Sequence, residues 1–181
     1  MDLQKMLHDL ENCPCGKKHT LVTRVVEISS GATARVGRIL TDAGFPKKLL
    51  LVADENTIRV SAGLLESLND AGFETKKIIY KNMMYAKVEQ VNELKALCSD
   101  IDGIISVGTG SLNDICRVTA HDMGKRLCIF ATAPSMDGFA SDTAPIITNN
   151  FKNSWKAEQP EVIIADTKIL AKAPVELKAA G

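Results

Sequence analysis

Short apolar runs rich in β-branched residues alternate along this chain with segments that repeat apolar residues at helical spacing. Such alternation is typical of a parallel sheet whose strands are joined by crossover helices. The expected strands cover residues 21–28, 49–53, 75–80, 104–107, 127–131 and 162–165. The order of elements therefore predicts an α/β fold, a Rossmann-like parallel sheet with helices on both faces.

Apolar stripes between these runs predict amphipathic helices over 32–43, 58–68 and 88–98. The first two stripes both end in Asp-Ala-Gly-Phe, and Gly44 and Gly72 suit the left-handed turn that closes a helix. The repeated ending indicates successive βα units. Residues 133–160 are richer in Ser, Asp, Thr and Asn and predict a long loop with a β-hairpin over 146–155.

The chain has 181 residues, of which 45% are hydrophobic, and this is enough for the core of one ordinary domain. Its 22 basic and 22 acidic side chains balance, which argues against nucleic acid or a membrane as partner and favours a small-molecule ligand. The apolar runs are too short to span a bilayer, and the first residues do not resemble a signal peptide. Five cysteines, an odd number, fit reduced thiols, so we expect a cytoplasmic protein.

A glycine turn follows the fourth apolar run. Residues 103–107 lead into Gly108-Thr109-Gly110-Ser111, at the head of a helical pattern. Glycines let the backbone approach an anion closely, and the free N–H groups of the helix attract it. The same turn also serves as a plain strand-to-helix connection, so the case for a nucleotide site depends on its surroundings.

Two acidic residues lie where such a ligand would bind. Asp54 follows the strand expected at 49–53, and a carboxylate at that edge can accept hydrogen bonds from ribose hydroxyls. It can equally cap a helix that begins near Thr57, and the two roles are compatible. Asp114 falls in the first turns of the next helix, where the helix dipole favours an acidic group with or without a ligand.

A second polar cluster, residues 132–141, comes directly after the strand expected at 127–131. The hydroxyls of Thr132, Ser135 and Ser141 can bond an amide or phosphates, and Asp137 can hold the hydroxyls of a polyol. Loops of this composition are also common as plain turns. The cluster adjoins the glycine turn if the strands at 104–107 and 127–131 are neighbours.

Cys13, Cys15 and His19 bring three soft metal ligands into seven residues. Their spacing departs from the usual Cys-x-x-Cys pattern, and the sequence offers no evident fourth ligand, so it disfavours a zinc site. The other cysteines fall on apolar faces and are expected to be core residues. No Gly-x-Ser-x-Gly elbow or Ser-His-Asp order supports acyl-transfer hydrolysis.

The motifs taken together resemble a known family. GTGSLND at 108–114, TAPSMDG at 132–138, and the strand at 162–166 followed by 174–181 are similar to bacterial sn-glycerol-1-phosphate dehydrogenases. That family belongs to a superfamily with glycerol dehydrogenase, iron-containing alcohol dehydrogenases and 3-dehydroquinate synthase. TAPSMDG is the specific part of the likeness, and CPCGKKH resembles a leader that some bacterial members carry.

The resemblance implies reduction of dihydroxyacetone phosphate to sn-glycerol 1-phosphate by NADH or NADPH, with a divalent metal, zinc or nickel, polarising the ketone. It assigns Asp137 to the substrate and no catalytic residue to this chain. The cofactor-binding residues that it implies are Asp54, Gly108, Gly110, Ser111, Leu112, Asn113, Asp114, Thr132, Ala133, Pro134, Ser135 and Ser141.

The resemblance also implies a division of the chain. Residues 1–170 would form a dinucleotide-binding domain, and 171–181 would begin a helical metal and substrate domain that is otherwise absent. In the family, the helix opened by Pro174 continues into a metal-binding motif, whereas this sequence ends at the first glycine of that motif, Gly181. We therefore expect the metal ligands beyond Gly181, an inactive chain on its own, and a homo-oligomer.

Three alternatives stay open: a polyol dehydrogenase, a 3-dehydroquinate synthase, against which TAPSMDG argues, and a non-catalytic nucleotide-binding module. The choice between NAD and NADP is also open. Asp54 would repel a ribose 2′-phosphate and favours NAD, but Lys47, Lys48 or Arg59 could offset its charge.

Overall fold

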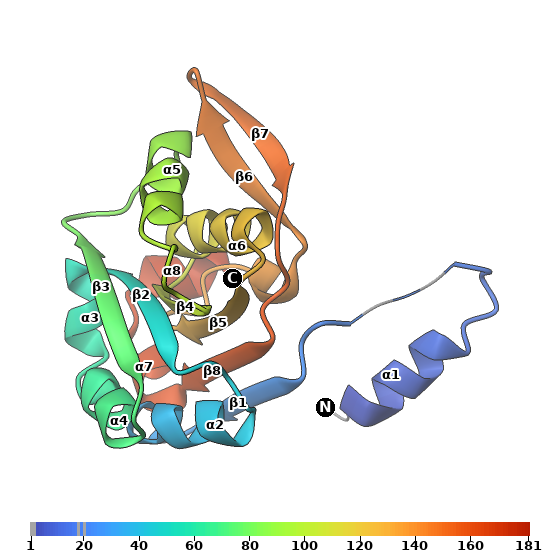
Figure 1. The fold of residues 1–181 in the computed structure, drawn as a ribbon, viewed down its shortest axis with the longest axis horizontal. Coiled ribbons are helices and arrows are strands. Elements are labelled where there is room, and N and C mark those ends of the chain that lie inside the picture. The colour runs from blue at the N-terminus through green and yellow to red at the C-terminus, as the bar shows by residue number, and fades with distance from the viewer. Residues whose placement is uncertain (1–2, 18, 20) are drawn as a thin grey trace.

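The computed structural model describes residues 3–17, 19 and 21–181 and contains a six-stranded sheet. All of its strand pairs are parallel, and their order is β1-β8-β5-β4-β2-β3 (Figure 1). The predicted α/β fold is confirmed. The strands are β1 (Val25–Ser29), β2 (Lys48–Asp54), β3 (Glu74–Tyr80), β4 (Gly103–Gly108), β5 (Arg126–Ala131) and β8 (Val162–Asp166).

Helices cover both faces of the sheet and enclose two cores. Leu50 and Val52 of β2 pack in one core with residues of the helices α5 and α6, while Leu49 and Leu51 pack in the other with η1, α2 and α4. Successive strand residues face opposite sides, so a strand buried on both faces is apolar throughout. The helices are α1 (Leu3–Glu11), η1 (Ala32–Arg35), α2 (Val36–Asp42), α3 (Glu55–Val60), α4 (Leu64–Asp70), α5 (Val88–Ala96), α6 (Ser111–Met123), η2 (Gly138–Ala140), α7 (Thr167–Lys172) and α8 (Val175–Ala180). None of the helices in the described ranges is long and apolar enough to cross a bilayer.

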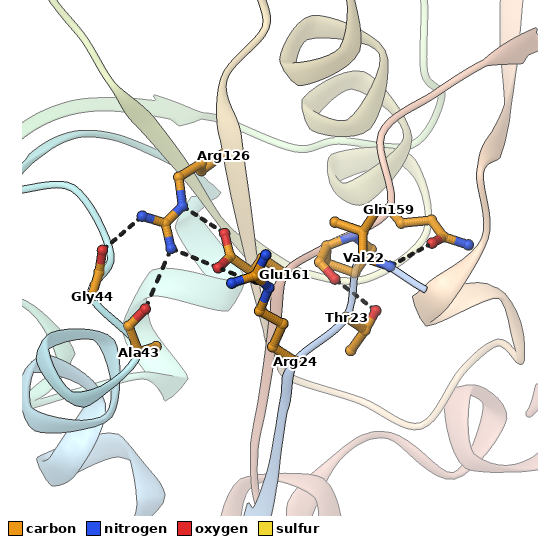
Figure 2. Close-up of polar contacts among 9 residues, drawn as sticks. Val22, Thr23, Arg24, Ala43, Gly44, Arg126, Gln159 and Glu161 are labelled. Atoms are coloured by element: carbon orange, nitrogen blue, oxygen red, sulfur yellow. Dashed lines mark hydrogen bonds and ion pairs between the residues drawn. The ribbon is translucent and has the colours of Figure 1, made fainter. Parts of the chain in front are cut away.

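The second expected helix and the first expected strand differ from the structure. The helix predicted over 58–68 is divided into α3 and α4, because Gly63 adopts a left-handed φ of 88° between them. The first strand begins at Val25, since the preceding residues bond to a loop rather than to a strand. Val22 N donates to Gln159 Oε1, and Thr23 Oγ1 donates to the carbonyl of Pro160 (Figure 2).

The predicted hairpin is confirmed and is longer than expected, with β6 (Thr143–Thr148) antiparallel to β7 (Phe151–Lys156). Asn149 and Asn150 both have positive φ, 51° and 64°, as a tight two-residue hairpin turn requires. The hairpin projects from the sheet, and its buried Ala144 and Ile146 join the core beneath α5 and α6 (Figure 1).

An ion-pair network closes the amino ends of the central strands (Figure 2). Arg126 at the start of β5 donates from Nε and Nη2 to both oxygens of Glu161, at 2.5 and 2.6 Å. Its Nη1 also donates to the carbonyl of Gly44, where the chain leaves α2 with φ 61°. This edge of the sheet is therefore filled by protein contacts, and the candidate ligand-binding loops lie at the opposite edge.

Candidate functional site

The carboxyl ends of three neighbouring strands bring the predicted ligand-binding segments together. β4 lies between β5 and β2, so the glycine turn has the 132–138 loop on one side and Asp54 on the other. Thr109 Oγ1 lies 2.7 Å from Ser135 Oγ, and Gly110 N donates to Met136 Sδ at 3.2 Å. The glycine turn therefore faces the polar loop, as the sequence predicts for neighbouring strands.

A cleft of about 880 Å³ opens beside this turn. Its volume is within the range of sites that hold small molecules and cofactors. Four of the predicted site residues line it, Asp54 from β2, Leu112 from α6, and Thr132 and Ala133 after β5, together with Thr109 of the glycine turn. The facing wall comes from α3, the segment after β3, and the start of the C-terminal helices, with Asn56, Thr57, Arg59, Val60, Asn82, Met83, Lys168, Ile169, Lys172, Ala173, Pro174 and Leu177.

The two glycines of the turn are required for different reasons. Gly110 has φ 49° and ψ −119°, a conformation that other residues rarely adopt, and a Cβ there would meet nothing within 4 Å. A ligand can therefore approach its backbone. At Gly108 a Cβ would lie 2.4 Å from Leu112 Cδ1, so this glycine lets the start of α6 pack against the end of β4.

Asp54 is a helix cap that also lines the cleft. Its Oδ1 accepts hydrogen bonds from the backbone N–H groups of Asn56 and Thr57, at 2.9 and 2.8 Å. Thr57 Oγ1 in turn accepts from Asp54 N, which completes a capping box at the start of α3. Both cap bonds use the same carboxylate oxygen, which leaves Oδ2 for a ligand hydroxyl. The structure thus contains the cap and keeps the second role geometrically open.

Several predicted residues turn their side chains away from the cleft. Asn113 is fully buried, and its Oδ1 accepts from Ser106 Oγ of β4 at 2.7 Å. Ser111 Oγ donates to the carbonyl of Met84, and Ser141 Oγ accepts from Thr143 N at the start of the hairpin. Asp137 is exposed on the loop.

Pro134 lines a separate apolar hollow next to β1 and β8. The side chains of Ser111 and Asn113 already have protein partners, so these two residues can offer only backbone groups to a ligand.

A buried arginine, which the sequence analysis did not single out, connects α6 to the polar loop. Arg117 is 2% exposed, lies 3.7 Å from Asp114, and donates from Nη2 to the carbonyl of Gly138. Burial raises the pKa of Asp114 to about 6, against the opposing charges of Arg117 and Lys152. The i, i+3 spacing of an acidic and a basic residue was the available signal in the sequence.

Asp166 is a second organising residue without a predicted role. It ends β8 and accepts hydrogen bonds from Gly31 N, Thr33 N, Thr33 Oγ1 and Lys168 N, at 2.8 to 3.1 Å. Burial acts to raise the pKa of Asp166, but the bonds from Thr33, Lys168 and Gly31 outweigh it and lower the pKa. The carboxylate fixes the start of η1 against β8. A lone Asp after a strand was its only sequence signal.

The structure corrects one expectation about the charges near Asp54. Lys48 begins β2 and Asp54 ends it, so about 20 Å of extended strand separates them. Lys47 Nζ bonds to Thr41 Oγ1 and to the carbonyl of Ala71 at that same far edge. Neither lysine can offset the charge of Asp54. Of the three cations considered, Arg59 is the one that lines the cleft with Asp54, and it donates to Asn56 Oδ1 at 2.7 Å.

The cleft offers no group of metal-ligating side chains among the residues that the structure describes. Asp54 is the one acidic residue of the described lining. In that part of the chain, the single cluster that could hold a metal ion is Cys13, Cys15 and His19, which lies outside the cleft. We therefore assign no metal-dependent step to the cleft residues.

Comparisons with known proteins identify similar sequences and folds. A model of the family described as iron-containing alcohol dehydrogenase matches residues 27–174. The chain is 36% identical, over 73% of its length, to a glycerol-1-phosphate dehydrogenase [NAD(P)+] of Bacillus velezensis, of which it covers 35%. It is 31% identical, over 91% of its length, to the protein of the same name from Methanococcoides burtonii, of which it covers 46%. The chain thus spans less than half the length of these relatives.

Solved structures share the fold at lower identity. Glycerol dehydrogenase from Schizosaccharomyces pombe superposes with a TM-score of 0.75 at 23% identity, over 86% of this chain and 40% of that protein. NADH-dependent butanol dehydrogenase A from Thermotoga maritima superposes with a TM-score of 0.77 at 17% identity, over 88% of this chain and 46% of that protein. At these identities the likeness shows the fold alone.

Proposed function

We propose a function for this chain, which belongs to the iron-containing alcohol dehydrogenase family. It is the dinucleotide-binding part of an NAD(P)-dependent oxidoreductase. The reaction is reduction of dihydroxyacetone phosphate to sn-glycerol 1-phosphate. Residues 1–170 form the dinucleotide-binding domain, and 171–181 begin the helical domain that completes the enzyme. The names of the relatives at 31% and 36% identity support this substrate.

One observation carries the nucleotide-binding role. The glycine turn, Asp54 and the 132–133 segment come from three adjacent strands and border a single cleft at the carboxyl edge of the sheet. Ligands of open α/β sheets bind at this edge. The open space at the Cβ position of Gly110 supports close approach of a pyrophosphate to the backbone.

The proposed roles follow from what each residue presents. Backbone N–H groups of Gly110, Ser111 and Asn113 bind the pyrophosphate, with α6 supplying its positive end. The N–H groups of Leu112 and Asp114 donate to the carbonyls of Thr109 and Gly110 and hold the turn in shape. Asp54 accepts from the adenosine ribose through Oδ2, while Thr132 and Ser135 bond near the nicotinamide. Leu112 and Ala133 line the walls, and Gly108 lets the start of α6 pack against β4. Pro134 lines the neighbouring apolar hollow. Ser141 belongs to the nicotinamide side as well, and Asp137 lies on the loop that would meet the substrate.

Cofactor preference depends on two opposed charges. Asp54 repels a ribose 2′-phosphate and favours NAD, and Arg59, which lines the same cleft, reduces that repulsion. Because the Arg59 guanidinium already bonds to Asn56, NAD is the preferred cofactor in this proposal.

Titration of the chain with NADH, followed by fluorescence, tests the nucleotide site. Gly110→Ala should weaken binding at least tenfold, which corresponds to about 1.4 kcal/mol. Gly124→Ala is the control, because Gly124 also has a positive φ, 59°, and open space at its Cβ, but it ends α6 far from the turn. Equal effects of the two substitutions, or saturable binding that neither changes, would remove the glycine turn from the proposal.

The homo-oligomer and the cytoplasmic location stay predictions. Ile28 at the edge strand β1 is 61% exposed, which supports association through this edge. Sedimentation of the chain at several concentrations tests the homo-oligomer, and a monomeric mass at every concentration would contradict it.

A further inference from the structure

Three metal-ligating side chains gather in the turn between α1 and the body of the protein. The ligand atoms of Cys13, Cys15 and His19 all lie within 4.8 Å of one another. Cys15 Sγ is 2.9 Å from His19 Nε2. Cys13 is half-buried and Cys15 is exposed, so an ion can reach the cluster from solvent.

Local backbone features produce this arrangement. α1 ends at Glu11, and Cys13 N bonds back to the carbonyl of Leu10 in the turn that follows the helix. Gly16 adopts φ 72°, a left-handed turn that reverses the chain after the second cysteine. Lys17 N then donates to Cys15 Sγ at 3.4 Å, a bond that stabilises negative charge on the sulfur. The turn thus presents both thiols toward the imidazole.

We propose that Cys13, Cys15 and His19 bind one zinc ion through both sulfurs and a ring nitrogen, with water as the fourth ligand. Two thiolates and an imidazole form a soft ligand set that suits zinc. Zn–S bonds of about 2.3 Å and Zn–N bonds of about 2.1 Å, at tetrahedral angles, separate the ligand atoms by about 3.6 to 3.8 Å. The three atoms need move only by about an ångström to reach these separations.

The sequence disfavoured this site because Cys-x-Cys departs from the usual knuckle and no fourth ligand is evident. The structure supplies new support for the site. His19 returns to Cys15 through the glycine turn, and a site with three protein ligands and a water is an established zinc geometry.

The proposed ion would affect the segment that follows α1 rather than the cleft. None of the three ligands lines the cleft. His19 is followed by Val22 and Thr23, which are bonded to Gln159 and Pro160 (Figure 2). An ion held between the end of α1 and His19 would therefore link α1 to an anchored part of the chain, since metal binding contributes folding free energy locally.

The test uses the 181-residue chain, reduced with a phosphine and freed of metal. Zinc affinity is measured by competition with a chromophoric chelator, and cobalt(II) serves as a spectroscopic probe. We expect one equivalent of zinc and, with cobalt, a thiolate charge-transfer band together with the intense visible bands of tetrahedral coordination. Hydrogen exchange of residues 10–19 should slow when zinc is added.

Cys13→Ser, Cys15→Ser and His19→Gln should each weaken zinc binding by about 100-fold or more, since each removes a direct ligand. His8→Gln is the matched control, an exposed histidine of α1 outside the cluster, and should bind as the parent does. The proposal is overturned if the reduced parent binds no zinc, if the cobalt spectrum lacks the thiolate band, or if all four variants bind equally. A Cys13–Cys15 disulfide in a chain that binds no zinc once reduced would also overturn it.

Discussion

Arg117 and Asp114 form an ion pair within α6, with Nη1 3.7 Å from Oδ1, although their side chains are only 2% and 12% exposed. The same guanidinium donates to the carbonyl of Gly138. One buried cation therefore connects the helix after the glycine turn to the loop that carries Asp137. Arg117 therefore contacts both the helix proposed to bind the cofactor and the loop proposed to bind the substrate.

Arg117→Met should destabilise the protein by about 3 to 5 kcal/mol, because removal of one partner leaves the buried Asp114 without its cation. Urea unfolding measures the loss. The double variant Arg117→Met with Asp114→Asn should recover part of it, since no uncompensated charge remains. A cost below about 1 kcal/mol for Arg117→Met would show that the pair is solvated and contributes little.

Stability should depend on pH through Asp114. Burial raises the pKa of this carboxyl from 3.8 to about 6 in the folded state, so the folded chain holds a proton that the unfolded chain releases. The associated stabilisation is present in full below the unfolded pKa and is lost as the pH rises through about 6.

Between about pH 4 and pH 7, the unfolding free energy of the parent should therefore fall by about 2 to 3 kcal/mol relative to that of Asp114→Asn, which lacks the titration. Urea unfolding of both proteins across this range measures the difference. Parallel pH profiles for the two would mean that Asp114 titrates normally.

The cap and ligand roles of Asp54 can be separated by two substitutions. Asn caps helices about as well as Asp, so Asp54→Asn should change stability by less than about 0.5 kcal/mol while it weakens NADH binding about tenfold. Asp54→Ala should lose about 1 kcal/mol of stability as well. Calorimetric NADH titration and thermal unfolding give the two readouts. Unchanged NADH binding in Asp54→Asn would leave this residue with the cap alone.

Met136 should compete with the cofactor. Its thioether accepts the hydrogen bond from Gly110 N, an amide that the proposed function assigns to the pyrophosphate. Sulfur is a weak acceptor, so Met136→Ala should free the amide and tighten NADH binding about 2- to 5-fold. Met6→Ala, an exposed methionine of α1, is the control. Tenfold weaker binding in Met136→Ala would instead indicate that the thioether contacts the cofactor.

Local chemistry made much of the fold predictable. The four inner strands of the sheet, β2, β4, β5 and β8, are short apolar runs buried on both faces. Their alternate residues pack into two different cores, so nearly every position has to be apolar. Gly44 and Gly72 end their helices in left-handed conformations, φ 61° and 73°, as the Asp-Ala-Gly-Phe endings predict. The hairpin and the capping role of Asp54 were predictable because both depend on residues close in sequence.

Other features depended on contacts that sequence spacing does not encode. The break at Gly63 was missed because the apolar stripe continues across it, from Ile58 to Leu64 and Leu68, in one shared core. Lys47 and Lys48 are close to Asp54 in sequence, but an extended strand carries them to the far edge of the sheet. The closeness of Cys15 and His19 likewise needed the actual turn at Gly16.

The sequence alone determined most of the strands, helices and turns, and the polar groups at strand ends, because these depend on side-chain periodicity and backbone preference. Only the tertiary structure decided that β4 lies between β5 and β2, and hence that Asp54, Thr109 and Thr132 border one cleft. It also decided that Arg117 is buried against Asp114 and Gly138. Strand order and burial result from the packing of the whole chain, which no local pattern specifies.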